Sequence, residues 1–144
     1  NAIVRIHPLP KKSLEDLEEV IHQTRNNDAM TMTLALSYGS REELTTAFRS
    51  LATKVKNNII SPGNIDETII NKHLYTHDLP DVDLLIRTSG EYRISNFLLW
   101  QIAYAELYFT KVFWPDFSEA HLIEAIKSYQ NRERRFGKTS EQLN

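Results

Sequence analysis

Residues 87–93 bring together the side chains in this sequence that are best suited to binding an anion. They include two arginines, Arg87 and Arg93, two hydroxyl residues, Thr88 and Ser89, and Gly90. Guanidinium groups donate in a fork that matches phosphate oxygens, and a glycine lets backbone N–H groups come close to a ligand. These residue types predict binding of a phosphate or a diphosphate.

The segments around this loop favour the same chemistry. Residues 82–86 are a short apolar run rich in branched side chains, typical of a strand buried on both faces of a parallel sheet. Residues 97–105 are apolar almost all round and predict a buried helix, whose N-terminus would add positive potential. Open α/β sheets bind ligands just past the carboxyl ends of their strands. The alternative is that each arginine is solvated or paired with a neighbour, here Glu91.

Glu106 follows the predicted helix directly and is the second candidate for chemistry. A carboxylate at the end of so apolar a segment is costly unless it is solvated, paired or bound to a metal ion. His73 and His77 are four residues apart, but without a cysteine or a third histidine nearby they do not predict a metal pair.

Length and composition fit one globular domain with a sizeable core. The chain has 144 residues, of which 41% are hydrophobic and 25% charged. A net charge of −2 gives no sign of a nucleic-acid footprint, and the absence of cysteine excludes disulfides and a thiolate nucleophile. No apolar run reaches membrane-spanning length. Because the sequence starts without methionine and inside a strand-like segment, we expect an upstream part to be missing.

The remaining pattern alternates strands with helices and predicts the α/β class, with a mostly parallel central sheet flanked by helices. The predicted strands are residues 2–6, 30–38, 82–86 and 107–109. Besides residues 97–105, the predicted helices begin at Ser13, Ser40, Asp66 and Ser118, with capping-box spacing from Ser13 to Asp16 and from Ser40 to Glu43. Residues 132–137 end the last helix with basic side chains and a glycine, and residues 138–144 form a loose tail.

Several motifs together resemble one known family. They are residues 83–91 (DLLIRTSGE), 93–101 (RISNFLLWQ), 105–109 (AELYF), 114–117 (WPDF) and 132–137 (RERRFG), with 38–41 (YGSR). These motifs closely resemble the cis-prenyltransferases, particularly the bacterial undecaprenyl diphosphate synthases. The resemblance implies that residues 1–144 are the C-terminal part of a single domain with that family's α/β fold.

The resemblance implies a transferase that condenses isopentenyl diphosphate onto an allylic diphosphate, usually farnesyl diphosphate. Repeated steps would make a long cis-polyprenyl diphosphate, such as undecaprenyl diphosphate for cell-wall lipid carrier synthesis. Members of the family need Mg²⁺ and work as homodimers. The expected location is the cytoplasm, with no transmembrane segment, and peripheral contact with a membrane stays open.

The resemblance also assigns residues by motif. Those expected to hold isopentenyl diphosphate are Arg87, Arg93, Ile94 and Ser95. Glu106 matches the family's magnesium-associated glutamate, while Arg135 and Gly137, with Arg132 nearby, would complete the phosphate clamp of the partner subunit. A straight helix over residues 96–105 is about 15 Å long, which makes it difficult for Arg93 and Glu106 to share one phosphate. Glu106 would then act at a distance, across the dimer or as a structural residue.

Two departures from the family pattern bear on activity. The N-terminal segment, with its Asp-Gly-Asn-Gly-Arg-Trp phosphate loop and the aspartate essential for magnesium, is absent from these 144 residues. No catalytic residue is therefore assigned in this chain, and we expect the chain alone to be inactive. Tyr92 stands where many bacterial relatives have histidine.

Two alternatives to an active transferase remain open. One is a non-catalytic dimerising subunit or inactive fragment of a cis-prenyltransferase, and the other is a generic phosphate-binding α/β domain.

Overall fold

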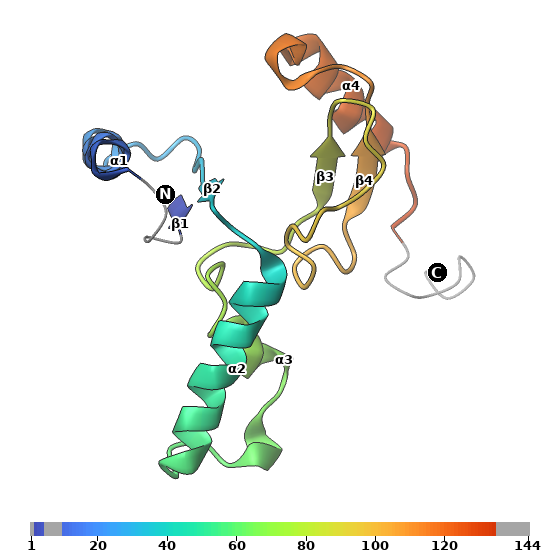
Figure 1. The fold of residues 1–144 in the computed structure, drawn as a ribbon. Coiled ribbons are helices and arrows are strands. Elements are labelled where there is room, and N and C mark those ends of the chain that lie inside the picture. Colours follow the sequence, from blue (N-terminus) through green and yellow to red (C-terminus); the bar gives the residue numbers. More distant parts are fainter. Residues whose placement is uncertain (1, 5–9, 135–144) are drawn as a thin grey trace. The chain divides into compact units, whose positions relative to one another are not determined.

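The computed structural model describes residues 2–4 and 10–134 and divides the chain into two compact units, Asn1–Leu79 (unit 1) and Pro80–Asn144 (unit 2) (Figure 1). Each unit holds one pair of parallel strands with helices, so the predicted α/β class and parallel pairing are confirmed. The predicted tail at residues 138–144 lies outside the described residues. In the part of the chain that is described, no helix combines the length and apolarity needed to cross a membrane.

Unit 1 starts with the parallel pair of β1 (Ala2–Val4) and β2 (Leu34–Leu36), and α1 (Lys11–Thr24) lies between them in the chain. The helix α1 begins directly after Pro10, whose extended backbone makes it the N-cap, so the predicted start at Ser13 is wrong. The strand β2 is shorter than predicted. Met30 and Met32 remain 79% and 63% exposed, because the buried face that their alternation suggested is not formed.

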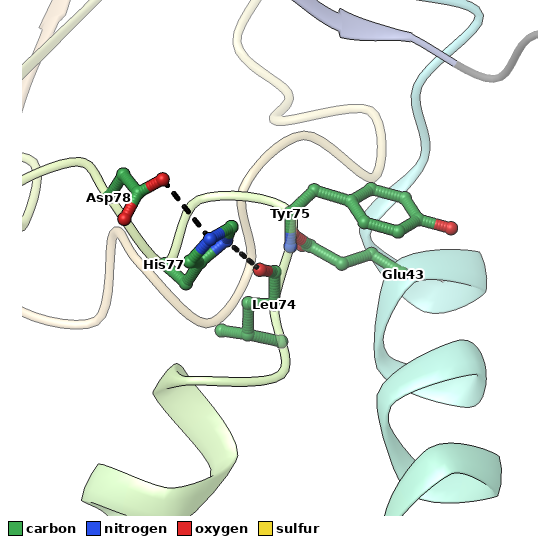
Figure 2. Close-up of polar contacts among 5 residues, drawn as sticks. All are labelled: Glu43, Leu74, Tyr75, His77 and Asp78. Carbon is green, nitrogen blue, oxygen red and sulfur yellow. Dashed lines mark hydrogen bonds and ion pairs between the residues drawn. The ribbon is translucent and has the colours of Figure 1, made fainter.

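The longest helix of unit 1, α2 (Ser40–Lys56), has Gly39 as its N-cap and no side-chain capping bond, so the predicted capping box of Ser40 and Glu43 is wrong. Both of those side chains are fully buried. The Glu43 carboxylate instead accepts hydrogen bonds from the Tyr38 hydroxyl at 2.6 Å and from the Tyr75 backbone N–H at 2.8 Å. Figure 2 shows Glu43 reaching from α2 to Tyr75. The Glu43 carboxylate, which was predicted to cap the start of α2, instead connects α2 to a residue 32 positions further along unit 1.

The rest of unit 1 follows the sequence prediction more closely. The 3-10 helix η1 (Pro62–Asn64) forms at the predicted turn, and α3 (Glu67–Asn71) begins where predicted. The Asp66 side chain caps α3 by accepting a hydrogen bond from the Ile69 backbone N–H at 2.8 Å. The helix ends at Asn71, three residues before the predicted end at Leu74, which is nevertheless buried.

The two histidines of this region are occupied by protein atoms. The Nδ1 atom of His73 lies 2.7 Å from a carbonyl oxygen of α3, which can only accept, so Nδ1 carries the proton and Nε2 accepts from Lys54 at 2.7 Å. His77 contacts the Leu74 carbonyl oxygen and the Asp78 carboxylate, each at 3.1 Å (Figure 2). Both rings therefore have structural partners within unit 1.

Unit 2 is built on the parallel strands β3 (Leu84–Arg87) and β4 (Glu106–Phe109), which start and end within two residues of the predicted strands. The 3-10 helix η2 (Trp114–Asp116) follows β4, and α4 (Glu119–Gln130) then begins after Ser118, its predicted N-cap. Among the described residues, the buried apolar side chains are Leu85, Ile102 and Ala125 in unit 2, and Ile3, Ala47, Leu51 and Leu74 in unit 1.

The segment of residues 88–105 returns from the end of β3 to the start of β4 and contains no helix, so the predicted buried helix over residues 97–105 is wrong. Ser95, Asn96 and Leu98 have φ angles of +54°, +62° and +47°. A right-handed helix needs negative φ at every residue, so these three residues interrupt it. Leu99 and Tyr104 are 42% and 64% exposed rather than buried. The helix N-terminus that was expected to favour an anion is therefore not formed.

Candidate anion-binding site

Arg87, the last residue of β3, remains the best-placed cation of the predicted loop. Its side chain is half-buried at the carboxyl end of the strand, where ligands of α/β sheets bind. Among residues 2–4 and 10–134, its guanidinium has no hydrogen-bond or ion-pair partner. A half-buried guanidinium without a protein partner is suited to an external anion.

The backbone of the loop is used differently from the prediction. The Ser89 N–H donates to the Val112 carbonyl oxygen at 2.8 Å, and the Gly90 N–H donates to the Thr110 carbonyl oxygen at 2.9 Å. Both residues have positive φ, +70° and +67°, which explains a glycine at position 90. Because these amides bind the segment after β4, the expectation that they lie open to a phosphate is wrong.

Arg93 forms an ion pair with Glu91, which is the alternative that the sequence left open for it. Its side chain is 63% exposed, so the pair is weak and an anion can compete for the guanidinium. Ser95 is exposed in a left-handed backbone conformation, and Ile94 is half-buried. Arg93, Ile94 and Ser95 thus lie in one loop after β3.

Glu106, the first residue of β4, is paired within its own chain. Its Oε2 atom accepts a hydrogen bond from Nη1 of Arg132 at 2.8 Å, and the same nitrogen donates to the Leu107 carbonyl oxygen at 2.9 Å. No hydrogen bond reaches Oε1 of Glu106 in the described part of the chain. Two residues predicted for different roles, Glu106 and Arg132, are therefore brought together, while Arg135 and Gly137 lie outside the described residues.

The predicted phosphate and metal residues lie at opposite ends of one strand pair. Leu84 pairs with Glu106 and Arg87 pairs with Phe109, so Glu106 marks the amino end and Arg87 the carboxyl end. Three residue steps of about 3.3 Å separate these ends by about 10 Å. The helix that was expected to separate Arg93 from Glu106 is not formed, and the strand pair sets a backbone distance only between Arg87 and Glu106.

One carboxylate oxygen without a hydrogen bond is a modest but suitable metal ligand. Mg²⁺ is usually held by one or two carboxylates together with substrate phosphates and water. Within the described residues there is no group of three or more histidine, aspartate or glutamate side chains that could hold an ion. Glu106 therefore fits as a single contributor to a Mg²⁺ site.

Two features of unit 2 were not predicted from the sequence. Asp83 accepts from Nη1 of Arg134 at 2.7 Å, although Arg134 was attributed only to the basic end of a helix. An apolar groove of about 450 Å³ is lined by Ile86, Trp114, Phe117, Ser118, Glu119 and Leu122. The WPDF motif was the available signal for the groove, whereas the sequence held no signal for the ion pair.

Among the described residues of unit 2, the Tyr108 hydroxyl has a pKa that its surroundings clearly change. Burial, then the nearby negative charge of Glu124 and a hydrogen bond to that carboxylate, raise the pKa of Tyr108 above its ordinary value of 10.0. Tyr108 is therefore protonated at neutral pH and links β4 to α4.

The fold and the arginine-bearing loop together define an α/β protein with an anion site past a parallel strand, and sequence comparison narrows this class. A family model described as "Putative undecaprenyl diphosphate synthase" matches residues 1–137. An isoprenyl transferase of Chlorobaculum tepidum is 53% identical over 135 residues, 94% of this chain and 51% of the relative. The chain belongs to the undecaprenyl diphosphate synthase family, the cis-prenyltransferases.

Further relatives agree with this assignment. A protein of Vibrio cholerae named "Ditrans,polycis-undecaprenyl-diphosphate synthase ((2E,6E)-farnesyl-diphosphate specific)" is 55% identical over 120 residues, 83% of this chain and 48% of that protein. Lavandulyl diphosphate synthase of Lavandula x intermedia, solved with dimethylallyl diphosphate, superposes with a TM-score of 0.91 at 41% identity, covering 96% of this chain and 59% of that one. The chain spans about half the length of the curated relatives it matches.

Proposed function

We propose that this chain supplies the isopentenyl diphosphate-binding part of a cis-prenyltransferase, with farnesyl diphosphate as the allylic substrate. The product would be a long cis-polyprenyl diphosphate, and undecaprenyl diphosphate for a cell-wall lipid carrier is the expected one. The observation that carries the proposal is the half-buried Arg87 guanidinium at the carboxyl end of β3, without a partner among the described residues. It lies in the DLLIRTSGE motif of a chain that belongs to this family.

The proposed chemistry needs no protein nucleophile. The diphosphate leaves the allylic substrate, the double bond of isopentenyl diphosphate attacks the resulting cation-like carbon, and a proton is lost from the new isoprene unit. Arg87 and Arg93 would bind the diphosphate of isopentenyl diphosphate and so fix its double bond, with Ile94 and Ser95 beside them. A bound Mg²⁺, held by Glu106 and substrate oxygens, would neutralise charge on the leaving diphosphate.

The positions of Arg87 and Glu106 support a site shared between two chains. Because they lie at opposite ends of the strand pair, about 10 Å apart, Glu106 of one chain would serve a diphosphate held elsewhere. A homodimer provides the second set of residues. Arg135 and Gly137, with Arg132 nearby in the sequence, would complete the phosphate clamp of the partner, while the Nη1 atom of Arg132 stays on Glu106 of its own chain. We further propose a cytoplasmic location with peripheral access to the membrane that receives the product.

Calorimetric titration with isopentenyl diphosphate tests the proposed binding role. Replacing Arg87 by glutamine removes a charge-assisted contact, so we expect Kd to rise about 10- to 100-fold. Arg49→Gln is the matched control, because Arg49 is exposed on α2 in unit 1 and should leave Kd unchanged. Inorganic pyrophosphate serves as a second titrant. Equal binding of both ligands would favour the generic phosphate-binding domain.

A transfer assay separates the proposed enzyme from its alternative, a non-catalytic subunit or inactive fragment. The chain would be assayed with Mg²⁺, farnesyl diphosphate and labelled isopentenyl diphosphate, alone and fused to the half of the Chlorobaculum tepidum relative that it does not match. Long-chain product from the fusion supports the enzyme. Binding without product in either form supports the alternative, which the coverage of about half of each curated relative motivates.

A further inference from the structure

The end of α4 is held against the amino ends of both strands of unit 2 by two arginines. Arg132 donates to Glu106 and to the Leu107 carbonyl oxygen, both in β4. Arg134 donates to the Asp83 carboxylate, one residue before β3, at 2.7 Å. Asp83 and Glu106 are neighbours across the strand pair, because the Glu106 N–H donates to the Asp83 carbonyl oxygen at 2.9 Å. Each strand end is therefore bound by one of the two arginines. We name Asp83, Glu106, Arg132 and Arg134 the strand-end cluster.

The strand-end cluster is partly shielded from water, so its ion pairs are screened less than ion pairs on the open surface. The side chains of Arg132, Glu106 and Arg134 are 34%, 26% and 29% exposed, and only Asp83 is largely exposed, at 64%. Two carboxylates on neighbouring strand ends repel each other, and two arginines offset that repulsion. Removing one member therefore leaves a half-buried charge without compensation.

Arg134 contacts Tyr129 in addition to its ion pair with Asp83. The same nitrogen that meets Asp83 donates to the Tyr129 hydroxyl at 3.0 Å, and the guanidinium carbon lies 5.6 Å from the centre of the Tyr129 ring. A cation over an aromatic face is attracted by the ring quadrupole. Tyr129 belongs to the last turn of α4, and its carbonyl oxygen accepts from the Arg132 N–H at 3.0 Å. Arg134 thus braces the turn that carries Arg132.

We propose that Arg134 is a positioning residue that acts through Arg132 on Glu106. By anchoring on Asp83 and Tyr129, Arg134 holds the Arg132 guanidinium on Oε2 of Glu106 and so fixes the carboxylate, leaving Oε1 without a hydrogen bond. Such supporting contacts orient carboxylates that bind metal ions. The link from Glu106 to Mg²⁺ rests on the proposed function, whereas the dependence of the Arg132 contact on Arg134 does not.

Side-chain NMR of ¹⁵N-arginine-labelled protein tests the structural step without any reaction. In wild-type protein we expect a shifted, slowly exchanging Arg132 guanidinium signal. Both Arg134→Gln and Asp83→Asn should move this signal to the position of a solvated arginine. The exchanged pair Asp83→Arg with Arg134→Asp should restore it in part. Lys127→Gln removes a positive charge from the exposed face of the same helix and is the control. An unchanged Arg132 signal in Arg134→Gln protein overturns the proposal.

The Mg²⁺ dependence of isopentenyl transfer by the active fusion tests the functional step. Arg134→Gln should raise the Mg²⁺ concentration for half-maximal rate about 10-fold, with the KM for isopentenyl diphosphate unchanged. General damage to the fold would instead lower kcat at every Mg²⁺ concentration. Normal activity with an unchanged Mg²⁺ requirement also overturns the proposal. If wild-type fusion transfers nothing, the proposed function fails, and the NMR result alone decides whether Arg134 positions Arg132.

Discussion

Replacement of the buried Glu43 should destabilise unit 1 more than replacement of any solvent-exposed residue of α2. The carboxylate is fully buried and accepts hydrogen bonds from the Tyr38 hydroxyl and the Tyr75 N–H. Hydrogen bonds to a charged group contribute about 1.5–3 kcal/mol each, so Glu43→Ala should lower the free energy of unfolding by about 3–6 kcal/mol. Glu43→Gln keeps an acceptor but loses the charge, and should cost about half as much.

Urea unfolding followed by far-UV circular dichroism measures this loss. With a slope of about 2 kcal/mol per molar urea, a loss of 3 kcal/mol lowers the midpoint by about 1.5 M. Tryptophan fluorescence gives a second probe, because Trp100 and Trp114 both lie in unit 2 whereas α1, α2 and α3 lie in unit 1. The fluorescence transition shows whether unit 2 unfolds with unit 1 or separately.

Glu42 provides the matched control for Glu43. It is the preceding residue of α2, half-buried, and its carboxylate meets the Tyr75 hydroxyl only at 3.3–3.4 Å. Glu42→Ala should therefore cost at most about 1 kcal/mol. If the midpoint shift in Glu43→Ala protein is no larger than that in Glu42→Ala protein, the hydrogen bonds that Glu43 accepts from Tyr38 and Tyr75 do not stabilise unit 1 as argued.

Two further predictions concern an alkaline titration and the core of unit 1. Because the pKa of Tyr108 is higher in the folded chain than in the unfolded chain, its contribution to stability is complete below about pH 10 and is lost as the pH rises through the folded value. Unfolding free energies measured from pH 8 to 11 should therefore fall less steeply above pH 10 in Tyr108→Phe protein, and absorbance titration at 295 nm should show Glu124→Gln lowering the Tyr108 pKa. In unit 1, Leu51→Ala should cost about 2–5 kcal/mol, because Leu51 is 3% exposed. Phe48→Ala, at a side chain that is 52% exposed, should shift the urea midpoint much less, and equal shifts would contradict the assignment of the core face of α2.

Local sequence patterns predicted the strands of unit 2 well. The apolar run at residues 82–86 predicted β3, and Arg87 lies at the carboxyl end of this strand as expected. This prediction succeeds because the apolar run and the polar residues that end it are adjacent in the sequence. The prediction for Arg93 kept Glu91 as an alternative partner, and the ion pair forms. Contacts between residues close in sequence can therefore be predicted from the sequence.

Contacts between residues far apart in sequence decided where the predictions failed. The spacing of Ser40 and Glu43 satisfies a capping box, yet Glu43 binds Tyr75, 32 residues away. Asp83 and Arg134 meet only because the last turn of α4 lies at the strand ends. No local pattern distinguishes these partners from solvent.

Backbone conformation was the second source of error. The apolar pattern of residues 97–105 has the composition of a buried helix, but Ser95, Asn96 and Leu98 adopt positive φ. Non-glycine residues rarely do so, and propensity rules accordingly assign them to helix or strand. The predicted helix over residues 97–105, whose N-terminus was expected to favour an anion, therefore does not form.

The parallel register of β3 and β4 has a consequence for how the protein is made. Leu84 pairs with Glu106, so the ribosome must add 22 further residues to reach the partner of each β3 residue. At 5–20 residues per second, β3 waits about 1–4 s for β4 to leave the ribosome. During that interval its backbone donors and acceptors are open to other chains. Co-translational aggregation of this family member should therefore depend on the speed at which codons 88–105 are read.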